Sequence, residues 1–285
     1  MALTSTISAP TLALGPHVFD TTNRALVMGI LNRTPDSFYD QGANFAFDQF
    51  LSKAEEHVNA GADFLDVGGV KAGPGEEVTE QEELERVVPA IEALAARFDV
   101  PLSIDTWRAS VAEACFAAGA VVGNDISGFG DPEYLNVAAA AGASVVATHI
   151  RLKPRVADPN PVYPDVVASV REFLLDRAGQ ARAAGIPPER IIVDAGLDLG
   201  KTAAQSLELL RSSADLADLG YPLLLSASNK TFLGVLLDLE VADRREASLS
   251  AVALGILRGC RVLRVHHVAG TVAVRDAVEA ILGAD

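Results

Sequence analysis

The chain has 285 residues, a length that suits one large α/β domain or two small ones. Its formal net charge of −15 argues against nucleic-acid binding, because a phosphate backbone requires a basic protein face. The same charge disfavours anionic membranes, and no apolar run approaches the roughly 18 residues that are needed to span a bilayer.

Residues 1–20 lack the basic start and the continuous apolar core of a secretory signal. The two cysteines, Cys115 and Cys260, lie far apart in the chain and form no CxxC pair. Such cysteine usage indicates a reducing compartment. We therefore expect a cytoplasmic protein.

Short β-branched or apolar runs recur in chain order, and Gly, Pro, Asn or Asp bounds each of them. These predicted strands cover residues 25–31, 64–68, 102–104, 121–123, 144–147, 191–193, 222–225 and 262–265. Stretches of helical period lie between them, among others at residues 47–59, 81–97, 111–118, 166–184 and 245–258. The alternation is typical of a parallel sheet with helical crossovers.

About eight such repeats predict an α/β fold of the (β/α)8 TIM barrel type. We assign residues 25–285 to this single domain, because no linker and no shift in composition divides them. Residues 1–24 form a lead-in that could cap the barrel bottom.

Every predicted strand ends on a polar or ionisable group. These strand-end residues are Asn32, Asp66, Asp105, Asn124, Asp125, His149, Asp194, Ser228, Lys230, Arg264 and His266. Ser228 with Lys230, and Arg264 with His266, share the strand period of two, so we expect each pair to point the same way. The loops after barrel strands meet at one face and carry active sites. The ring therefore predicts a pocket that hydrogen-bonds a flat polar molecule and holds an anion.

Two motifs suggest other chemistries but lack the residues that these need. Residues 194–202 end in Gly-Lys-Thr, but Ala195 stands where a phosphate-binding P-loop requires Gly. His266 and His267 are adjacent and would face opposite sides of a strand, and no further ligand stands at zinc spacing. The sequence therefore predicts neither a nucleotide triphosphatase nor a zinc site.

Seven segments together resemble the dihydropteroate synthase family, in order and spacing, over nearly the whole chain. They are MGILNRTPDSF at 28–38, DFLDVGG at 63–69, SIDT at 103–106, NDI at 124–126, GKT at 200–202, SNK at 228–230 and RVH at 264–266. The resemblance implies a barrel, usually a homodimer, that joins 6-hydroxymethyl-7,8-dihydropterin diphosphate to p-aminobenzoate and releases diphosphate. It also implies Mg²⁺ as the cofactor.

By the resemblance, the pterin ring is held by Asp105, Asn124, Asp194 and Lys230. Their chemistry fits this role, because carboxylate and amide oxygens accept hydrogen bonds from the amino and ring N–H groups of a pterin. A lysine in turn donates to the pterin carbonyl and ring nitrogen.

The resemblance assigns the diphosphate end to other strand-end residues. Arg264 and His266 bind the diphosphate, since an arginine suits bidentate phosphate contact. Asn32 coordinates Mg²⁺, a hard cation that prefers oxygen ligands. Ser228 completes the substrate-binding set. The expected catalytic residues are Asp105, Lys230, Arg264 and His266.

The chain departs from the family pattern in the loops around the predicted pocket. After the second strand the family has Glu-Ser-Thr-Arg-Pro-Gly, and its Thr and Arg fall here on Ala72 and Gly73. Asn229 stands where the family has Arg, and Asp198 and Leu199 stand where it has Gly and Phe. Further replacements are His267 for Asp, and Arg33 and Tyr39 for smaller residues.

These replacements cluster on the amine-binding and loop-closing parts. Charge-assisted hydrogen bonds contribute about 1.5–3 kcal/mol each, so losing two arginines corresponds to about 3–6 kcal/mol, or roughly two to four decades in rate. We therefore predict a diverged, paralogous synthase with weak or no activity. Lys71 or Arg33 could partly compensate for the missing loop arginine.

Three other interpretations stay open on the sequence alone. The chain could be an active dihydropteroate synthase of folate biosynthesis with unusual loops. It could be another pterin-binding barrel enzyme, such as a methyltransferase that acts on a methyl-pterin. It could also be a non-catalytic binding protein, because a fold does not determine a function.

Overall fold

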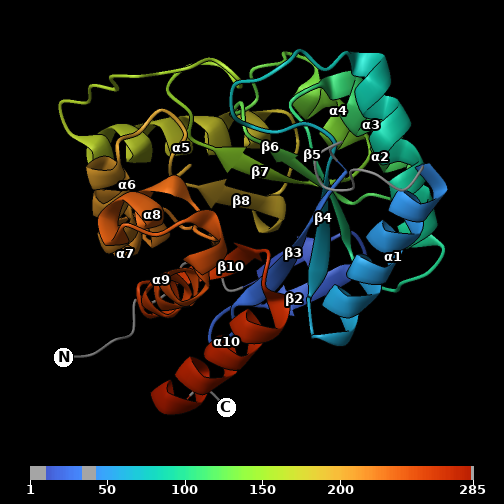
Figure 1. Ribbon diagram of the computed structural model, residues 1–285. Helices are drawn as coiled ribbons and strands as arrows, with labels where there is room; N and C mark the ends of the chain where they lie inside the picture. Colours follow the sequence, from blue (N-terminus) through green and yellow to red (C-terminus); the bar gives the residue numbers. More distant parts are fainter. Residues whose placement is uncertain (1–10, 34–42, 284–285) are drawn as a thin grey trace.

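The computed structural model describes residues 11–33 and 43–283. Eight parallel strands close into a barrel in the order β10-β3-β4-β5-β6-β7-β8-β9, and helices surround it (Figure 1). The strands are β3 (Leu26–Asn32), β4 (Phe64–Gly68), β5 (Leu102–Asp105), β6 (Val122–Asp125), β7 (Ser144–Thr148), β8 (Ile191–Asp194), β9 (Leu223–Leu225) and β10 (Cys260–Val265). The predicted (β/α)8 barrel is confirmed.

The helices are α1 (Ala43–Asn59), α2 (Glu80–Ala95), α3 (Ala109–Ala118), α4 (Tyr134–Ala140), α5 (Val166–Ala183), α6 (Ala203–Arg211), α7 (Ser213–Ala217), α8 (Thr231–Leu237), α9 (Arg245–Leu257) and α10 (Val268–Leu282). The residues at the start of α2 show why the helix begins there. The Thr79 hydroxyl accepts the Glu82 backbone N–H, and the Glu82 carboxylate accepts the Thr79 N–H, which is a capping box. Within the described residues, no helix combines the length and the apolar character that a membrane crossing requires.

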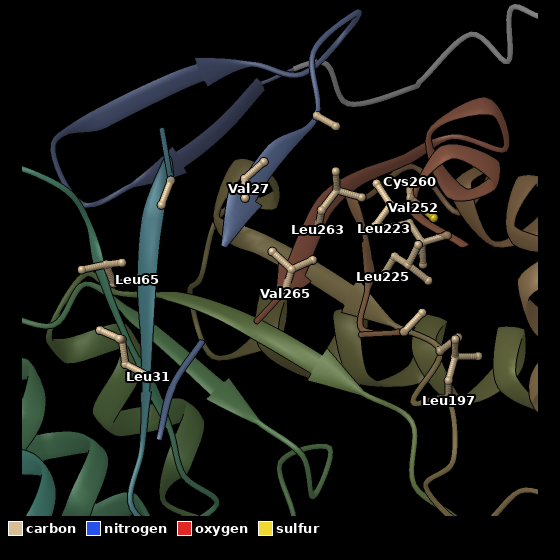
Figure 2. Packing of buried hydrophobic residues seen from close by; sticks show 14 of the residues in the cluster. Val27, Leu31, Leu65, Leu197, Leu223, Leu225, Val252, Cys260, Leu263 and Val265 are labelled. Carbon is tan, nitrogen blue, oxygen red and sulfur yellow. The ribbon is translucent and has the colours of Figure 1, made fainter. Parts of the chain in front are cut away.

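Alternate residues of each strand pack on opposite sides of the barrel wall. Leu26 and Met28 of β3 belong to a buried cluster inside the barrel. Val27 and Leu31 of the same strand belong to the larger cluster between the strands and the helices, part of which Figure 2 shows. Both sides of the strands are therefore apolar, as is usual for a parallel sheet that is covered by helices.

A two-stranded hairpin closes the N-terminal end of the barrel. It consists of β1 (Thr11–Leu14) and β2 (His17–Asp20). Leu12 and Leu14 are fully buried in the interior cluster, and the Ser144 hydroxyl donates to the Ala13 carbonyl at 2.5 Å. With this end filled, the end of the barrel that remains available for a ligand is the one where the strands finish.

Strand register places the polar strand ends side by side. Asn32 of β3 pairs with Gly68 of β4, Gly68 pairs with Asp105 of β5, and Asp105 pairs with Asn124 of β6. Gly68 has no side chain, and the Asn32 amide oxygen lies 3.6 Å from the position that a Cβ would take there. The glycine therefore leaves room between two functional side chains.

Four predicted strand-end residues lie beyond the ends of the strands, and two of these, His149 and His266, directly follow β7 and β10. Strand β9 ends at Leu225, so Ser228 and Lys230 lie in the loop that follows it. Asn229 between them has a φ of +58°, and Lys230 is the N-cap of α8. The predicted strand period is wrong for Ser228 and Lys230, because a left-handed residue breaks the alternation.

An ion cluster at the start of β4 ties the barrel bottom together. The buried Asp63 carboxylate accepts from Arg24 at 2.5 Å, from Arg275 at 3.1 Å and from the Val27 backbone N–H at 2.7 Å. One carboxylate thereby links β3, β4 and α10 at the end of the barrel that is remote from the strand-end residues.

We expect Asp63→Ala to lower the free energy of unfolding by about 3–5 kcal/mol, because it breaks a buried ion cluster from one side. Denaturant unfolding would measure this change. Asp99→Ala is the matched control, since the Asp99 side chain is fully exposed, and it should change stability by less than about 0.5 kcal/mol. Equal unfolding midpoints for the two variants would contradict this role for Asp63.

Candidate functional site

A largely buried guanidinium, whose side chain is 17% exposed, connects the strand ends. Arg264 of β10 donates from Nε to Asp66 Oδ2 at 2.6 Å and from Nη2 to Asp105 Oδ2 at 2.6 Å. Asp66 is fully buried and also accepts from the Ser103 hydroxyl at 2.6 Å and from the Asn124 amide at 3.1 Å. This network, which we call the Arg264 cluster, joins β4, β5, β6 and β10.

The Arg264 cluster changes the protonation of its members. Burial raises the pKa of Asp105 to about 7, and the neighbouring carboxylate of Asp66 adds to the rise, whereas Arg264 opposes it. Burial lowers the pKa of Arg264, but Asp66 and Asp105 outweigh this effect and hold it above its ordinary value. Asp105 therefore titrates near neutral pH beside a permanent positive charge.

A second group of polar side chains lies at the ends of β8 and β9. The Asp194 carboxylate accepts the Gly196 backbone N–H at 2.8 Å, and Lys230 Nζ donates to the Leu197 carbonyl at 3.0 Å. Burial raises the pKa of Asp194. Burial also lowers the pKa of Lys230, and the carboxylates of Asp198 and Asp194 oppose this.

Asp198 stands where the family has Gly, and its side chain contacts two helices. Its φ is +65°, a conformation that favours glycine. Its carboxylate accepts the Phe232 backbone N–H at 3.2 Å and the Ser206 hydroxyl at 3.2 Å. Asp198 therefore links the starts of α6 and α8 and places a negative charge near Lys230.

Lys201 is a buried lysine whose contacts the Gly-Lys-Thr motif did not reveal. Its Nζ lies 2.8 Å from His149 Nδ1, 2.8 Å from the Gly196 carbonyl and 3.0 Å from the Leu199 carbonyl. Burial lowers the pKa of Lys201 to about 7, and burial together with Lys201 lowers the pKa of His149 to about 3. The neutral histidine accepts from the lysine, and the pair holds the turn after β8 in place.

Two predicted substrate-binding residues, Ser228 and His266, lie close to one another. His266 Nδ1 is 3.0 Å from the Ser228 hydroxyl oxygen, and the His266 backbone N–H donates to the same oxygen at 3.2 Å. His266 follows Arg264 by two residues, so the structure brings Ser228, Arg264 and His266 to one edge of the barrel mouth.

The loops that depart from the family pattern line a cavity of about 320 Å³. The β4–α2 loop (residues 69–79) contributes Ala72 and Gly73, and the turn after β8 contributes Asp198, Leu199 and Lys201. The β7–α5 loop (residues 149–165) supplies the remaining wall. The cavity thus opens where the family places its loop threonine and arginine.

Arg33 does not replace the missing loop arginine. Its guanidinium packs over the rings of Phe47 and Phe50 of α1, 5.1 and 5.7 Å from their centroids. It therefore points to the helix side of the barrel wall rather than into the mouth. The rest of the first motif, residues 34–38, and Tyr39 lie outside the described residues.

The metal expectation rests on Asn32. Its exposed side chain offers an amide oxygen beside Gly68 at the end of β3. Within residues 11–33 and 43–283, no group of three or more His, Cys, Asp or Glu side chains could hold a metal ion. An amide oxygen is a ligand type that Mg²⁺ accepts, because this hard cation prefers oxygen ligands and usually keeps several waters.

Sequence reasoning missed two members of the site. The sequence predicts Asp66 as a strand end without a role, and Ser103 stands only within a motif. The signal was available, because Asp66 and Ser103 occupy paired positions on neighbouring strands. What a sequence cannot display is that Arg264, about 200 positions later, returns to the same carboxylate.

Comparison with known proteins agrees with this geometry. The model of the family described as pterin binding enzyme matches residues 28–266. The inactive dihydropteroate synthase 2 of Mycobacterium tuberculosis is 43% identical over 267 residues, which are 92% of this chain and 84% of that protein. The dihydropteroate synthase of Synechocystis sp. is 40% identical over 275 residues, which are 95% of each chain.

Solved structures give the same result. The Yersinia pestis dihydropteroate synthase with a sulfonamide drug complex has a TM-score of 0.90 and 38% identity, and the match covers 96% of this chain and 100% of that one. The Xanthomonas albilineans dihydropteroate synthase with 4-aminobenzoic acid has a TM-score of 0.90 and 36% identity, and the match covers 97% and 100%.

The raised pKa of Asp105 predicts a pH-dependent stability. A carboxyl group whose pKa is about 7 in the fold, against about 3.9 in the unfolded chain, stabilises the fold while it is protonated. This contribution is present below about pH 4 and is lost as the pH rises through about 7. Between about pH 4 and pH 7, the free energy of unfolding should fall by roughly 2–4 kcal/mol less in Asp105→Asn than in the unmodified chain.

Denaturant unfolding at a series of pH values would measure this effect. Asp99→Asn is the control, because its exposed carboxylate should leave the slope unchanged. If Asp105→Asn and the unmodified chain have the same slope between pH 4 and 8, Asp105 does not titrate as described.

Proposed function

The chain belongs to the dihydropteroate synthase family of pterin-binding enzymes, and on this basis we propose that it keeps a pterin and diphosphate pocket while its synthase activity is weak or lost. One observation carries the proposal. The Arg264 cluster at the barrel mouth is fully connected, whereas the β4–α2 loop above it presents Ala72 and Gly73 to the cavity.

The pterin would lie between the two groups of polar strand ends. Asp105 and Asn124 stand on one side, and Asp194 and Lys230 stand on the other. Their carboxylate and amide oxygens accept from the ring N–H and amino groups, and Lys230 donates to a ring acceptor. Asp66 would act as a positioning residue, because it orients both the Arg264 guanidinium and the Asn124 amide.

The diphosphate would lie toward β3 and β10. Arg264 and His266 supply donors, Ser228 supplies a hydroxyl, and Asn32 would hold Mg²⁺ through its amide oxygen. The bound Mg²⁺ would supply positive charge to the phosphate oxygens of the leaving group. Arg264 would meet the diphosphate by giving up one of its contacts with Asp66 or Asp105, so anion binding and the state of the Arg264 cluster are coupled.

In the family reaction, the bond between the pterin methylene carbon and the diphosphate oxygen breaks, the amine nitrogen forms the new bond to that carbon, and the amine then loses a proton to water or to the released diphosphate. Arg264, His266 and Lys230 would stabilise the departing negative charge. The loops would exclude water from the electron-poor methylene group and orient the amine.

The loop substitutions explain a weak activity. Ala72 and Gly73 offer no side-chain donor to an anionic ligand, and Asn229 uses its backbone groups for Ser248 and Arg244. The loss of about 3–6 kcal/mol of charge-assisted contacts would slow the reaction by roughly two to four decades. The similarity to inactive synthase 2 proteins, at 43% identity, also supports a weak or lost synthase activity.

The remaining parts of the proposal concern assembly and location. We propose a homodimer in the cytoplasm, with residues 25–285 acting as one barrel domain. An apolar surface at the α8 end supports the dimer, since Val235, Leu237 and Val241 are 66%, 57% and 56% exposed. A non-catalytic pterin-binding protein is the second candidate, and tight pterin binding without turnover would favour it.

The central experiment measures dihydropteroate by mass spectrometry, with purified protein, pterin diphosphate, p-aminobenzoate and Mg²⁺. We expect a rate at least about a hundredfold below that of an ordinary synthase. Turnover at an ordinary rate would contradict the proposal and favour the active-synthase interpretation.

The double variant Gly73→Arg with Asn229→Arg should raise this rate by about tenfold or more, because it returns two cations to the mouth. A Cβ at Gly73 would meet no atom of the described chain within 4 Å, so the larger side chain has room. Asn229 is left-handed, and arginine there costs about 1–2 kcal/mol of stability. The matched control is Gly73→Gln with Asn229→Gln, and an equal gain from both pairs would show that charge is not the defect.

Asn32→Ala should weaken the Mg²⁺-dependent binding of pterin diphosphate by about tenfold and leave the binding of the diphosphate-free pterin unchanged. Isothermal titration calorimetry with and without Mg²⁺ would separate the two. An equal loss for both ligands would mean that Asn32 shapes the pterin site and does not serve the metal.

A further inference from the structure

An arginine from a distant loop holds the β4–α2 loop. Arg155 of the β7–α5 loop donates its backbone N–H to the Ala72 carbonyl at 3.1 Å. Its Nη1 donates to the Lys71 carbonyl at 3.1 Å, and its Nη2 donates to the Glu76 carbonyl. A single residue thus binds three carbonyls that span most of the loop.

This contact crosses the barrel mouth. The two loops follow β4 and β7, and β5 and β6 stand between those strands in the barrel. Figure 1 shows both connections at the top of the view, the β7–α5 connection in yellow-green and the β4–α2 connection in teal. The contact therefore reaches past the strand ends that carry Asp105 and Asn124.

The β7–α5 loop is itself anchored on its other side. The Tyr163 hydroxyl donates to the Gly200 carbonyl at 2.8 Å, and the Gln205 side chain donates to the Pro161 carbonyl at 3.2 Å. Within the loop, Arg151 forms a two-point ion pair with Asp158 at 2.5 and 2.8 Å. Arg155 therefore projects from a supported base, and these contacts together join the β7–α5 loop to both of its neighbours around one cavity.

The conformation of Arg155 agrees with a specific role. Its φ is +64°, which a residue with a side chain adopts when its surroundings determine it. The fork of the guanidinium suits two carbonyls at once, which a lysine ammonium does not match. The same guanidinium lies 3.1 Å from the position of a Cβ at Gly75, so the glycine gives it room.

We propose that Arg155 is a positioning residue that straps the β4–α2 loop across the barrel mouth and sets the shape of the loop-lined cavity before any ligand binds. The loop has no arginine of its own, and Arg33 points to the helix side. With this strap, the β4–α2 loop has its shape at the barrel mouth before a ligand binds. Any effect of the strap on ligand exchange rests on the proposed function.

The test measures cleavage of the ligand-free full chain by glutamyl endopeptidase after Glu76 and Glu77, followed by mass spectrometry. Arg155→Ala should be cleaved there at least about fivefold faster, since two side-chain hydrogen bonds are lost. The cleavage rate of Arg155→Lys should lie between the rates of the unmodified chain and Arg155→Ala, because an ammonium can donate a good hydrogen bond to only one carbonyl. Arg182→Ala is the matched control, because Arg182 is an exposed arginine in the last turn of α5, and it should leave cleavage after Glu76 and Glu77 unchanged.

A second variant keeps the test decisive if Arg155→Ala folds poorly. Gly75→Val leaves Arg155 in place but puts a branched side chain against its guanidinium, so cleavage should rise in the same way. If both act on the strap, the double variant should be cleaved no faster than Arg155→Ala. Unchanged cleavage in Arg155→Lys and Gly75→Val, or fully additive effects, would overturn the proposal.

The ligand arm uses pterin diphosphate with Mg²⁺ and follows its dissociation rate. Arg155→Ala should release it several-fold faster, whereas Arg182→Ala should not. If the unmodified chain binds no pterin diphosphate, the proposed function fails and the cleavage result alone decides on the strap. Faster cleavage with unchanged release would reject the part of the proposal that concerns ligand exchange.

Discussion

The site depends on one largely buried guanidinium that is shared by two carboxylates. Burying an ion costs several kcal/mol unless its partners are well placed. Arg264 meets this condition with Asp66 and Asp105, both at 2.6 Å, and Asp66 also binds Asn124. The polar ends of β4, β5, β6 and β10 are thereby tied together at one level. A shift of any of these strands would leave a buried charge without its partner, so the cluster and the strand register support each other.

The same burial determines what the site can do. Asp105 has a pKa of about 7 because it is buried, while Arg264 keeps its charge at every accessible pH. Without a ligand, the Arg264 guanidinium already donates hydrogen bonds to the carboxylates of Asp66 and Asp105. An anion that approaches Arg264 competes with Asp66 and Asp105, and protonation of Asp105 weakens that competition. Pterin recognition and anion recognition are therefore linked through one side chain and do not form two independent subsites.

Much of this arrangement could be predicted from the sequence, and the misses have physical causes. The alternation of apolar runs and helical stretches predicted the barrel, and the strand-end positions of Asn32, Asp105, Asn124 and Asp194 follow from strand periodicity. The predicted strand period of two is wrong for the residues after β9, because the strand ends at Leu225 and Asn229 adopts a left-handed backbone. Arg33 was considered as a compensating cation, yet strand alternation turns it toward α1. The Arg155 contact depends on which loops meet across the mouth, and no local pattern encodes that.

The contrast between strand ends and loops gives a physical reason for divergence in this chain. Arg264 and Asp66 are coupled, since removing either of them leaves the other's charge without its main partner, so such changes threaten the fold itself. The loop positions are different. Ala72 and Lys71 contribute backbone carbonyls to the strap, and these remain whatever the side chain is. A loop can therefore lose its donors to a ligand while Arg155 keeps its shape. Substitutions that reduce the chemistry are tolerated there at little cost in stability, and the pterin-facing strand ends persist beneath them.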